Sequence, residues 1–413
     1  YRVSAFAVSH DGKYIASGDV NGNVTVWNVQ DAKMLWRVRA HKTTGAGMAE
    51  DWVWSAAFTP DGNQLLTGGG NKIIRVWDVE AGKILRTLEG HGGSWFTGSA
   101  IIYSIAVFSD SKKAITGGGD GTVRVWEIQS GSLVKTFKAS EGFLGQGSVL
   151  SVDISPDGKY SLSSGGDNTI RLWGNETGQG LLTMKVTDEP WLDSVVFAKD
   201  GLWAISSGFK LRFWDLKTGA LLREVKEAEG CGAKYLSVSK NGKLLLASGC
   251  KFIKLWDIDS AQLLRSYRGD KGFSASGIFD AAVFHPNNKW IVTKGIDASV
   301  RIKDMDTDEE IALLVSFVDG EWIVITSDGY YNSSEKGAKY LSIIVDDKKY
   351  DMNLFYDVFY RPDIVAAKLR GEDIKDLITI TMKDAIKSPP PAVEISPITA
   401  SPTSPKAKVC YNV

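Results

Sequence analysis

Residues 113–126 read KAITGGGDGTVRVW, and this stretch decides the fold. An apolar segment ends in small residues at Gly117, a tight turn follows at Gly119-Asp120-Gly121, and a second alternating segment ends at Trp126. Alternation of apolar and polar side chains is typical of β-strands, in which successive side chains point to opposite faces. Gly and Asp suit the backbone angles of tight turns. The stretch therefore predicts a β-hairpin that carries a large aromatic residue.

The same unit recurs along the chain. Asp-Gly turns precede it, as at Asp61-Gly62, and a further short strand follows it, as at Gly82–Leu88. A tryptophan ends the third strand six times, at spacings of 50, 49, 47, 41 and 42 residues: Trp27, Trp77, Trp126, Trp173, Trp214 and Trp256. A seventh unit, Val300–Asp304, has Lys303 in the tryptophan position. Helical repeats fit poorly, because apolar residues recur at every second position within each unit and not at the spacing of a helix.

Four strands in every unit of about 40 to 50 residues are the pattern of a propeller blade. The sequence therefore predicts an all-β fold, a seven-bladed β-propeller with a small mixed C-terminal extension and a Pro-rich tail.

Short motifs carry a family resemblance. Trp77-Asp78, Trp214-Asp215 and Trp256-Asp257 are Trp-Asp dipeptides, and Gly90-His91 is a Gly-His pair. On these motifs, residues 1–317 resemble the WD-repeat propeller family. The resemblance implies a structural tetrad of hydrogen-bonded side chains, which here would comprise His91, Thr116, Asp120 and Trp126. A His-Asp-Thr set can also suggest catalysis, but the structural interpretation is preferred because buried polar groups need partners.

Composition excludes several classes of protein. The chain has 413 residues, 43% hydrophobic and 23% charged, with a formal net charge of -1, which argues against a broad nucleic-acid or anionic-membrane surface. No apolar run is long enough to insert into a membrane. Three cysteines and four histidines show no disulfide or zinc spacing, so neither a metal nor a cofactor is predicted. The Gly-rich turns lack the lysine and the helix that a phosphate loop requires.

The start of the chain leaves its location open. The first residue is Tyr1, which fits both a removed leader and a trimmed chain. Exported (periplasmic or extracellular) and cytoplasmic locations are therefore equally compatible with the sequence.

Three regions are predicted along the chain: residues 1–317 as the propeller, 318–387 as a connector with a hairpin and short helices, and 388–413 as a Pro-rich segment and the start of an immunoglobulin-like sandwich. In the connector, Gly320–Thr326 is predicted as a strand, and Asn353–Tyr360 and Pro362–Arg370 as helices. Tyr1 already begins an inner strand, so the outer strand of blade seven comes either from Glu310–Phe317 or from a segment upstream.

The connector carries a second resemblance. Asp319–Ile325, Gly329–Asn332 and Phe359–Asp363 are similar to a connector in certain bacterial multidomain proteins, where it follows a WD-repeat propeller and precedes a short immunoglobulin-like sandwich and a caspase-like protease domain. A protease of that kind needs a histidine and a nucleophilic cysteine in its own domain. No such domain is present, and no histidine follows Cys410. On this resemblance the chain ends inside the sandwich, before any protease.

The favoured function is a non-catalytic scaffold that recruits a protein partner. The loops that join each blade to the next are long and carry aromatic residues, which are typical anchors of protein interfaces. The predicted partner-binding residues are Trp52, Trp95, Phe96, Phe143, Trp191 and Phe273. The alternative for each ring is that it folds over its own blade.

Other functions remain as alternatives. An enzyme that uses the central channel is disfavoured, because no acid/base or nucleophile set recurs at the inner strand ends and the histidines are assigned to structure. An architectural subunit would use the C-terminal tail as a strand added to another copy, giving an oligomer or fibre, although a flexible linker is preferred for the tail. A regulatory part of a caspase-like protease is the third alternative.

Overall fold

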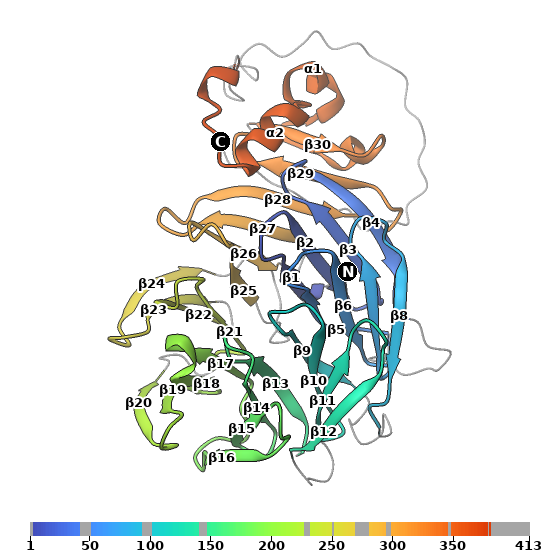
Figure 1. The fold of residues 1–413 in the computed structure, drawn as a ribbon. Coiled ribbons are helices and arrows are strands. Elements are labelled where there is room, and N and C mark those ends of the chain that lie inside the picture. The colour runs from blue at the N-terminus through green and yellow to red at the C-terminus, as the bar shows by residue number, and fades with distance from the viewer. Residues whose placement is uncertain are drawn as a thin grey trace.

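The computed structural model describes residues 3–41, 51–92, 101–139, 147–226, 232–249, 252–268, 281–294, 299–345, 348–378 and 380. Seven antiparallel sheets follow one another around a central axis and form a ring (Figure 1). The predicted seven-bladed β-propeller is confirmed.

Six blades have four strands each, in sequence order from the channel outward. Their bounds are, for blade one, β1 (Val3–Val8), β2 (Tyr14–Asp19), β3 (Asn23–Asn28) and β4 (Lys33–Arg39); for blade two, β5 (Val53–Phe58), β6 (Gln64–Gly69), β7 (Ile73–Asp78) and β8 (Ile84–Glu89); for blade three, β9 (Ile102–Val107), β10 (Lys113–Gly118), β11 (Thr122–Glu127) and β12 (Leu133–Lys138). Those of the next three are, for blade four, β13 (Val149–Ile154), β14 (Tyr160–Gly165), β15 (Thr169–Gly174) and β16 (Gly180–Lys185); for blade five, β17 (Ser194–Ala198), β18 (Trp203–Ser207), β19 (Lys210–Asp215) and β20 (Leu221–Lys226), with a short η2 (Lys199–Gly201); for blade six, β21 (Tyr235–Val238), β22 (Leu244–Gly249), β23 (Phe252–Asp257) and β24 (Leu263–Arg268).

Blade seven is the exception, because its sheet has six strands. Its bounds are β25 (Ala281–Phe284), β26 (Trp290–Lys294), β27 (Ser299–Asp304), β28 (Glu310–Ser316), β29 (Trp322–Thr326) and β30 (Tyr331–Ser333). All four regular strands of this blade come from residues 281–316, and β28 is the outer one. The remaining elements lie beyond it: η3 (Gly337–Tyr340), β31 (Ser342–Val345), β32 (Lys348–Asp351), η4 (Met352–Phe355), α1 (Tyr356–Phe359), α2 (Pro362–Leu369) and η5 (Lys375–Leu377).

The repeated tryptophans build the hydrophobic cores between neighbouring blades. Trp126 of blade three, for example, shares a core with Leu66 and Ile74 of blade two. Burying apolar surface between sheets is the main stabilising contribution of such a ring. In blade seven Lys303 stands in the tryptophan register, opposite Ile291, and its ammonium group pairs with Asp308 at 2.5 Å.

The connector continues the propeller. A turn in which the N–H of Phe317 donates to the carbonyl of Glu321 at 2.8 Å leads directly from β28 into β29. Core residues of blade one, such as Trp27, share one cluster with Leu314 of blade seven and with Phe359 and Ile364 of the connector. The boundary placed after residue 317 therefore does not separate two cores. The helix expected at 353–360 is divided into η4 and α1, and residues 388–413 lie outside the described residues.

The connector also bridges the seam between the first and last blades, which lie side by side below it in Figure 1. The amide of Asn332 donates to the carbonyl of Ala32 at 2.9 Å. The rings of Trp27 and Trp322 meet edge to face, with centroids 6.2 Å apart. The connector thus adds packing and a hydrogen bond across this seam to the direct contacts of the two blades.

Candidate functional site

The seven inner strands line a central cavity of about 290 Å³. Each inner strand begins at the face that carries the long loops. The pairing of β1, β5 and β13 with their neighbours skips one residue near this end, at Ser4, Trp54 and Leu150. These residues and Tyr103 line the cavity. In blades one to four, a repeated β-bulge thereby presents one side chain of each blade at the loop-side mouth of the channel.

Aromatic residues form one wall of this mouth. The ring of Trp52 stacks on that of Trp54, with centroids 5.1 Å apart and an angle of 26° between the planes. Trp54 in turn meets the edge of Tyr103 at 5.6 Å. This aromatic row spans blades two and three, and burial raises the pKa of Tyr103. Such rings offer a large, rigid apolar surface to a partner.

Charged residues form the opposite wall, on blades five to seven. Lys294 is only 4% exposed, although it belongs to the channel lining. Its ammonium group donates to the carbonyl of Ser4 at 2.9 Å and lies 4.9 Å from the ring centre of Tyr235. Asp193 and Lys234 line the same cavity.

The lysine is specific to blade seven. The sheet register places Lys294 opposite Val300, and the corresponding positions of the other blades hold glycine or serine: Gly18, Gly68, Gly117, Ser164, Ser207 and Ser248. At this strand position a long cation therefore enters the channel from blade seven alone, beside the seam with blade one.

Two carboxyl groups in the channel have shifted pKa values. Burial raises the pKa of Asp153 to about 6, although the N–H of Phe197 donates to its carboxylate at 2.7 Å. Burial likewise raises the pKa of Asp193 to about 6, against the opposing charge of Lys234 and a hydrogen bond from the side chain of Trp191. Both groups therefore titrate close to neutral pH, so the charge of the channel depends on pH in that range.

The structure places two of the six predicted partner-binding residues in this region. Trp52 belongs to the aromatic row, and Trp191 is 44% exposed in the loop before β17. Trp95, Phe96, Phe143 and Phe273 lie outside the described residues.

Sequence reasoning missed most of the channel residues: Trp54, Tyr103, Asp153, Asp193, Lys234, Tyr235 and Lys294. A signal for three of them exists in the sequence, where a serine follows Trp54, Tyr103 and Asp193 at the same point of each inner strand. Two of these serines contact the next blade: Ser55 donates to the carbonyl of Ile102 at 2.9 Å, and Ser104 accepts from the N–H of Val152 at 3.1 Å.

The proposed tetrad of blade three forms a chain of hydrogen bonds. The indole N–H of Trp126 donates to the hydroxyl of Thr116 at 2.9 Å, and this hydroxyl lies 2.8 Å from Nε2 of His91. Nδ1 of His91 lies 3.0 Å from the carboxylate of Asp120. Burial alone would raise the pKa of Asp120, but the hydrogen bond and charge of His91, together with hydrogen bonds from Thr122 and from the N–H of Gly92, lower it to about 2. His91 is buried and lines neither described cavity, so this geometry suits a structural role.

Blade two carries a variant of this arrangement. Nδ1 of His41 lies 3.0 Å from the amide oxygen of Asn71, and Nε2 lies 3.2 Å from the hydroxyl of Thr67. Burial lowers the pKa of His41 to about 4, and the adjacent Arg75 acts in the same direction. The ring is therefore neutral at physiological pH and links the strands without a charge.

Within the described part of the chain, no group of three or more His, Cys, Asp or Glu side chains is arranged to hold a metal ion. None of the helices in that part is both long enough and apolar enough to cross a membrane.

Comparison with known proteins agrees with this architecture. Residues 1–28, 38–78, 82–127 and 131–174 match the WD40 family, described as WD domain, G-beta repeat. The chain is also similar to the target of rapamycin complex subunit wat1 of Schizosaccharomyces pombe (strain 972 / ATCC 24843), with 30% identity over 105 residues, which are 24% of this chain and 32% of the relative. The chain thus spans about a third of the length of this curated relative. The matched repeats and the seven-bladed ring together support the assignment of the chain as a WD-repeat propeller.

Proposed function

We propose that this protein is a non-catalytic scaffold that recruits a protein partner through its long-loop face. The observation that carries the proposal is the loop-side mouth of the channel, where the row of Trp52, Trp54 and Tyr103 faces a wall with Asp193 and Lys234. Aromatic residues are enriched at the centre of protein interfaces, and polar and charged groups surround them at the rim.

The rigid ring favours binding at this surface. Trp54 and Tyr103 lie within inner strands, and the other residues of the site lie directly before inner strands, so their backbone loses little freedom when a partner docks. Trp191 extends the surface outward, since it is exposed and linked to Asp193. The charged wall sets the orientation of the partner and the rate of its approach.

The similarity to known proteins supports the same class of function. WD40 propellers typically bind proteins, and the relative that the chain resembles is named as a subunit of a complex. The tether to an effector through the C-terminal sandwich, and a caspase-like protease as that effector, rest on the sequence of the connector and tail alone. The proposal that copies of the chain assemble through the tail also rests on the sequence of the tail alone.

Partner capture with matched variants tests the proposal. The tagged protein is used to isolate binding proteins from the organism that encodes it, and each candidate is then purified and titrated by calorimetry. We expect Trp52→Ala with Trp54→Ala, and separately Trp191→Ala, to weaken binding at least tenfold. The control is Leu264→Ala, which removes an exposed apolar side chain from outer strand β24. Equal affinity of all variants for the purified partner would reject the long-loop face as the binding surface.

A further inference from the structure

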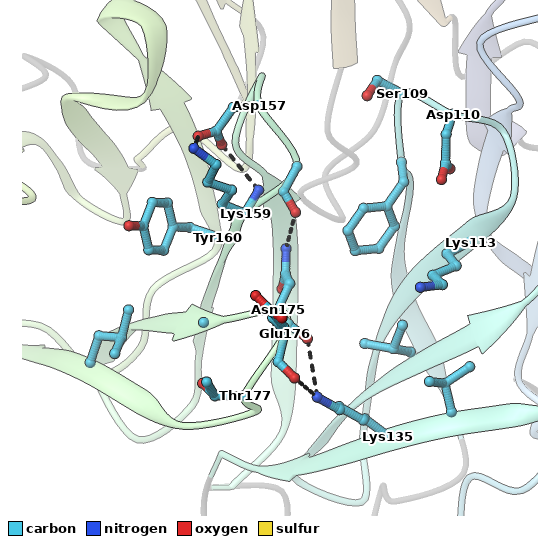
Figure 2. Close-up of a pocket in the computed structure, with 16 residues that line it drawn as sticks. Ser109, Asp110, Lys113, Lys135, Asp157, Lys159, Tyr160, Asn175, Glu176 and Thr177 are labelled. Atoms are coloured by element: carbon cyan, nitrogen blue, oxygen red, sulfur yellow. Dashed lines mark hydrogen bonds and ion pairs between the residues drawn. The ribbon is translucent and has the colours of Figure 1, made fainter.

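A second cavity, of about 790 Å³, opens between blades three and four, on the side of the ring opposite the long loops. Hairpin turns line it, namely those after β9, β13 and β15. Figure 2 shows Lys113 and Lys135 on one side and Asp157, Lys159 and Tyr160 on the other. We call this cavity the blade three–four groove.

The gap between blades one and two shows how aromatic rings can fill this space. Tyr14 stacks on Phe58 with centroids 6.4 Å apart, and its hydroxyl donates to Glu80 at 2.9 Å. Trp36 stacks on Trp77 at 5.6 Å, and its indole N–H donates to the carbonyl of Val79 at 2.7 Å. Two aromatic rings of blade one therefore close this gap against blade two.

In the blade three–four groove the same two positions hold lysines. Tyr14 is paired with Asn28 at the start of its strand, and Lys113 with Glu127 in the same way. Trp36 lies opposite Val26, and Lys135 opposite Val125. The bulky rings are absent, so the space that they fill between blades one and two is open here.

Blade four widens the groove further. Two residues after the tryptophan position, the other blades have apolar side chains that are buried: Val29, Val79, Ile128, Leu216, Ile258 and Met305. Blade four has Asn175 there, which accepts a hydrogen bond from Ser161 at 2.6 Å and donates to the carbonyl of Gly158 at 2.9 Å. One residue earlier it has Gly174, where the others have Asn, Asp or Glu. The hydrogen bond between Ser161 and Asn175 holds the turn in blade four. The buried apolar side chain and the polar side chain that the other blades have at these two positions are both missing.

Of the three lysines that line the groove, two have a partner and one has no ion pair among the described residues. Lys159 pairs with Asp157 at 3.6 Å, and Lys135 donates to the carbonyl of Asn175 at 3.4 Å. Lys113 has no ion pair within the described part of the chain. Glu176 contributes only its backbone carbonyl to Lys135, so its carboxylate adds a negative charge on the blade-four side.

The floor between the lysines is apolar. Phe108 and Val125 are buried there, and Val134 is exposed at its edge. The groove thus combines room for an aromatic ring, an apolar floor and an unpaired ammonium group on the blade-three wall.

From this arrangement we propose that the blade three–four groove binds an extended segment of a protein partner in which an aromatic residue stands next to an acidic one. The aromatic ring occupies the space that Tyr14 and Trp36 fill between blades one and two. The carboxylate pairs with Lys113, away from Glu176. This site lies on the other side of the ring from the long-loop face and is independent of it.

Short labelled peptides test the proposal directly. Three fluorescein-labelled, C-terminally amidated peptides, GSDWSG, GSKWSG and GSDASG, are titrated with the full chain by fluorescence anisotropy. We expect GSDWSG to bind at least tenfold more tightly than either of the others, because only it supplies both the ring and the negative charge.

Two variants link binding to the groove. Lys113→Glu should reverse the preference, so that GSKWSG binds better than GSDWSG, a result that loss of folding cannot produce. Lys135→Trp copies the closed gap of blades one and two and should weaken GSDWSG at least tenfold while the circular dichroism spectrum stays native. Lys240→Glu, an exposed lysine of blade six, and Trp191→Ala should leave GSDWSG binding unchanged.

The proposal is overturned if no peptide binds at millimolar protein, if the three bind equally, or if Lys113→Glu and Lys135→Trp leave the affinities unchanged. Loss of GSDWSG binding in Trp191→Ala would move the site to the long-loop face and would also contradict it.

Discussion

The side chain of Asn332 donates a hydrogen bond to the backbone carbonyl of Ala32 at 2.9 Å, although 300 residues separate the two in sequence. Between blades one and two a long side chain of the outer strand reaches the corresponding turn of the next blade, as Trp36 donates to the carbonyl of Val79 at 2.7 Å. In blade seven this position is Ala312, opposite Ile302, and its side chain has no polar group. The added strand β30 supplies a hydrogen bond to this turn instead.

We therefore predict that Asn332→Ala destabilises the propeller by about 1–3 kcal/mol, the cost of leaving a buried carbonyl without its donor. Urea unfolding of the full chain, followed by tryptophan fluorescence, measures the change. Asn63→Ala, at an exposed turn of blade two, is the control and should change stability by less than about 0.5 kcal/mol. Equal effects of the two substitutions would show that β30 does not secure the seam.

Blade six offers a gain of stability. The indole N–H of Trp256 is buried and finds no acceptor. In blade five the equivalent Trp214 donates to Ser206 at 3.0 Å, whereas the matching position of blade six is Ala247. We expect Ala247→Ser to raise the free energy of unfolding by about 1 kcal/mol by supplying the hydroxyl.

The matched loss is Ser206→Ala, which should lower the free energy of unfolding by about 1–3 kcal/mol. Thermal unfolding of both variants beside the wild type provides the comparison. A loss of stability in Ala247→Ser would mean that the indole of blade six does not occupy the same position relative to its strand.

The carboxylate of Asp120 should give the tetrad a recognisable pH dependence. Its folded pKa of about 2 lies below the ordinary value of 3.8, so its contribution to stability is complete above the unfolded value and is lost as pH falls through the folded one. We predict that Asp120→Asn lowers the free energy of unfolding at pH 6, and that this difference shrinks by about 1 kcal/mol between pH 6 and pH 3. Urea unfolding at the two pH values tests this, and a constant difference would contradict it.

Asp153 should behave in the opposite sense. Its folded pKa of about 6 lies above the ordinary 3.8, so the folded chain holds more protons than the unfolded one between these values and stability falls as pH rises. Asp153→Asn removes that penalty. Its free energy of unfolding, relative to that of the wild type, should therefore rise by about 1–3 kcal/mol as the pH increases from 4 to 7.5. The exposed Asp306→Asn is the control, and it should show no such trend. A stability difference between Asp153→Asn and the wild type that does not change with pH would show that this carboxylate is exposed to water.

The blade repeat was predictable from sequence because it is local. Trp126 and the turn at Asp120 lie within one hairpin, so spacing alone indicates their relation. Blade seven was predictable for the same reason, because Lys303 occupies the tryptophan position of the repeat.

The role of the connector was not predictable in the same way. The strand at Trp322–Thr326 was expected, but alternation does not reveal which sheet edge a strand joins. Its pairing with β28 depends on contacts such as that of Trp322 with Trp27, which lie far apart in the chain.

The candidate site was only partly predictable for a related reason. Trp52 and Trp191 stood out as aromatic residues in loops, whereas Lys294 lies within a strand and reads as an ordinary polar position. Lys294 reaches Ser4 and Tyr235, on two other blades, because the blades close into a ring.

Hydroxyl-radical footprinting of the complex with its identified partner tests the central claim most directly. The account predicts that the partner protects Trp52, Trp54 and Trp191 from oxidation, while Leu263 and Leu264 on the outer strand β24 are oxidised as in the free protein. Protection of the outer strand with unchanged oxidation of these three tryptophans would contradict binding through the long-loop face.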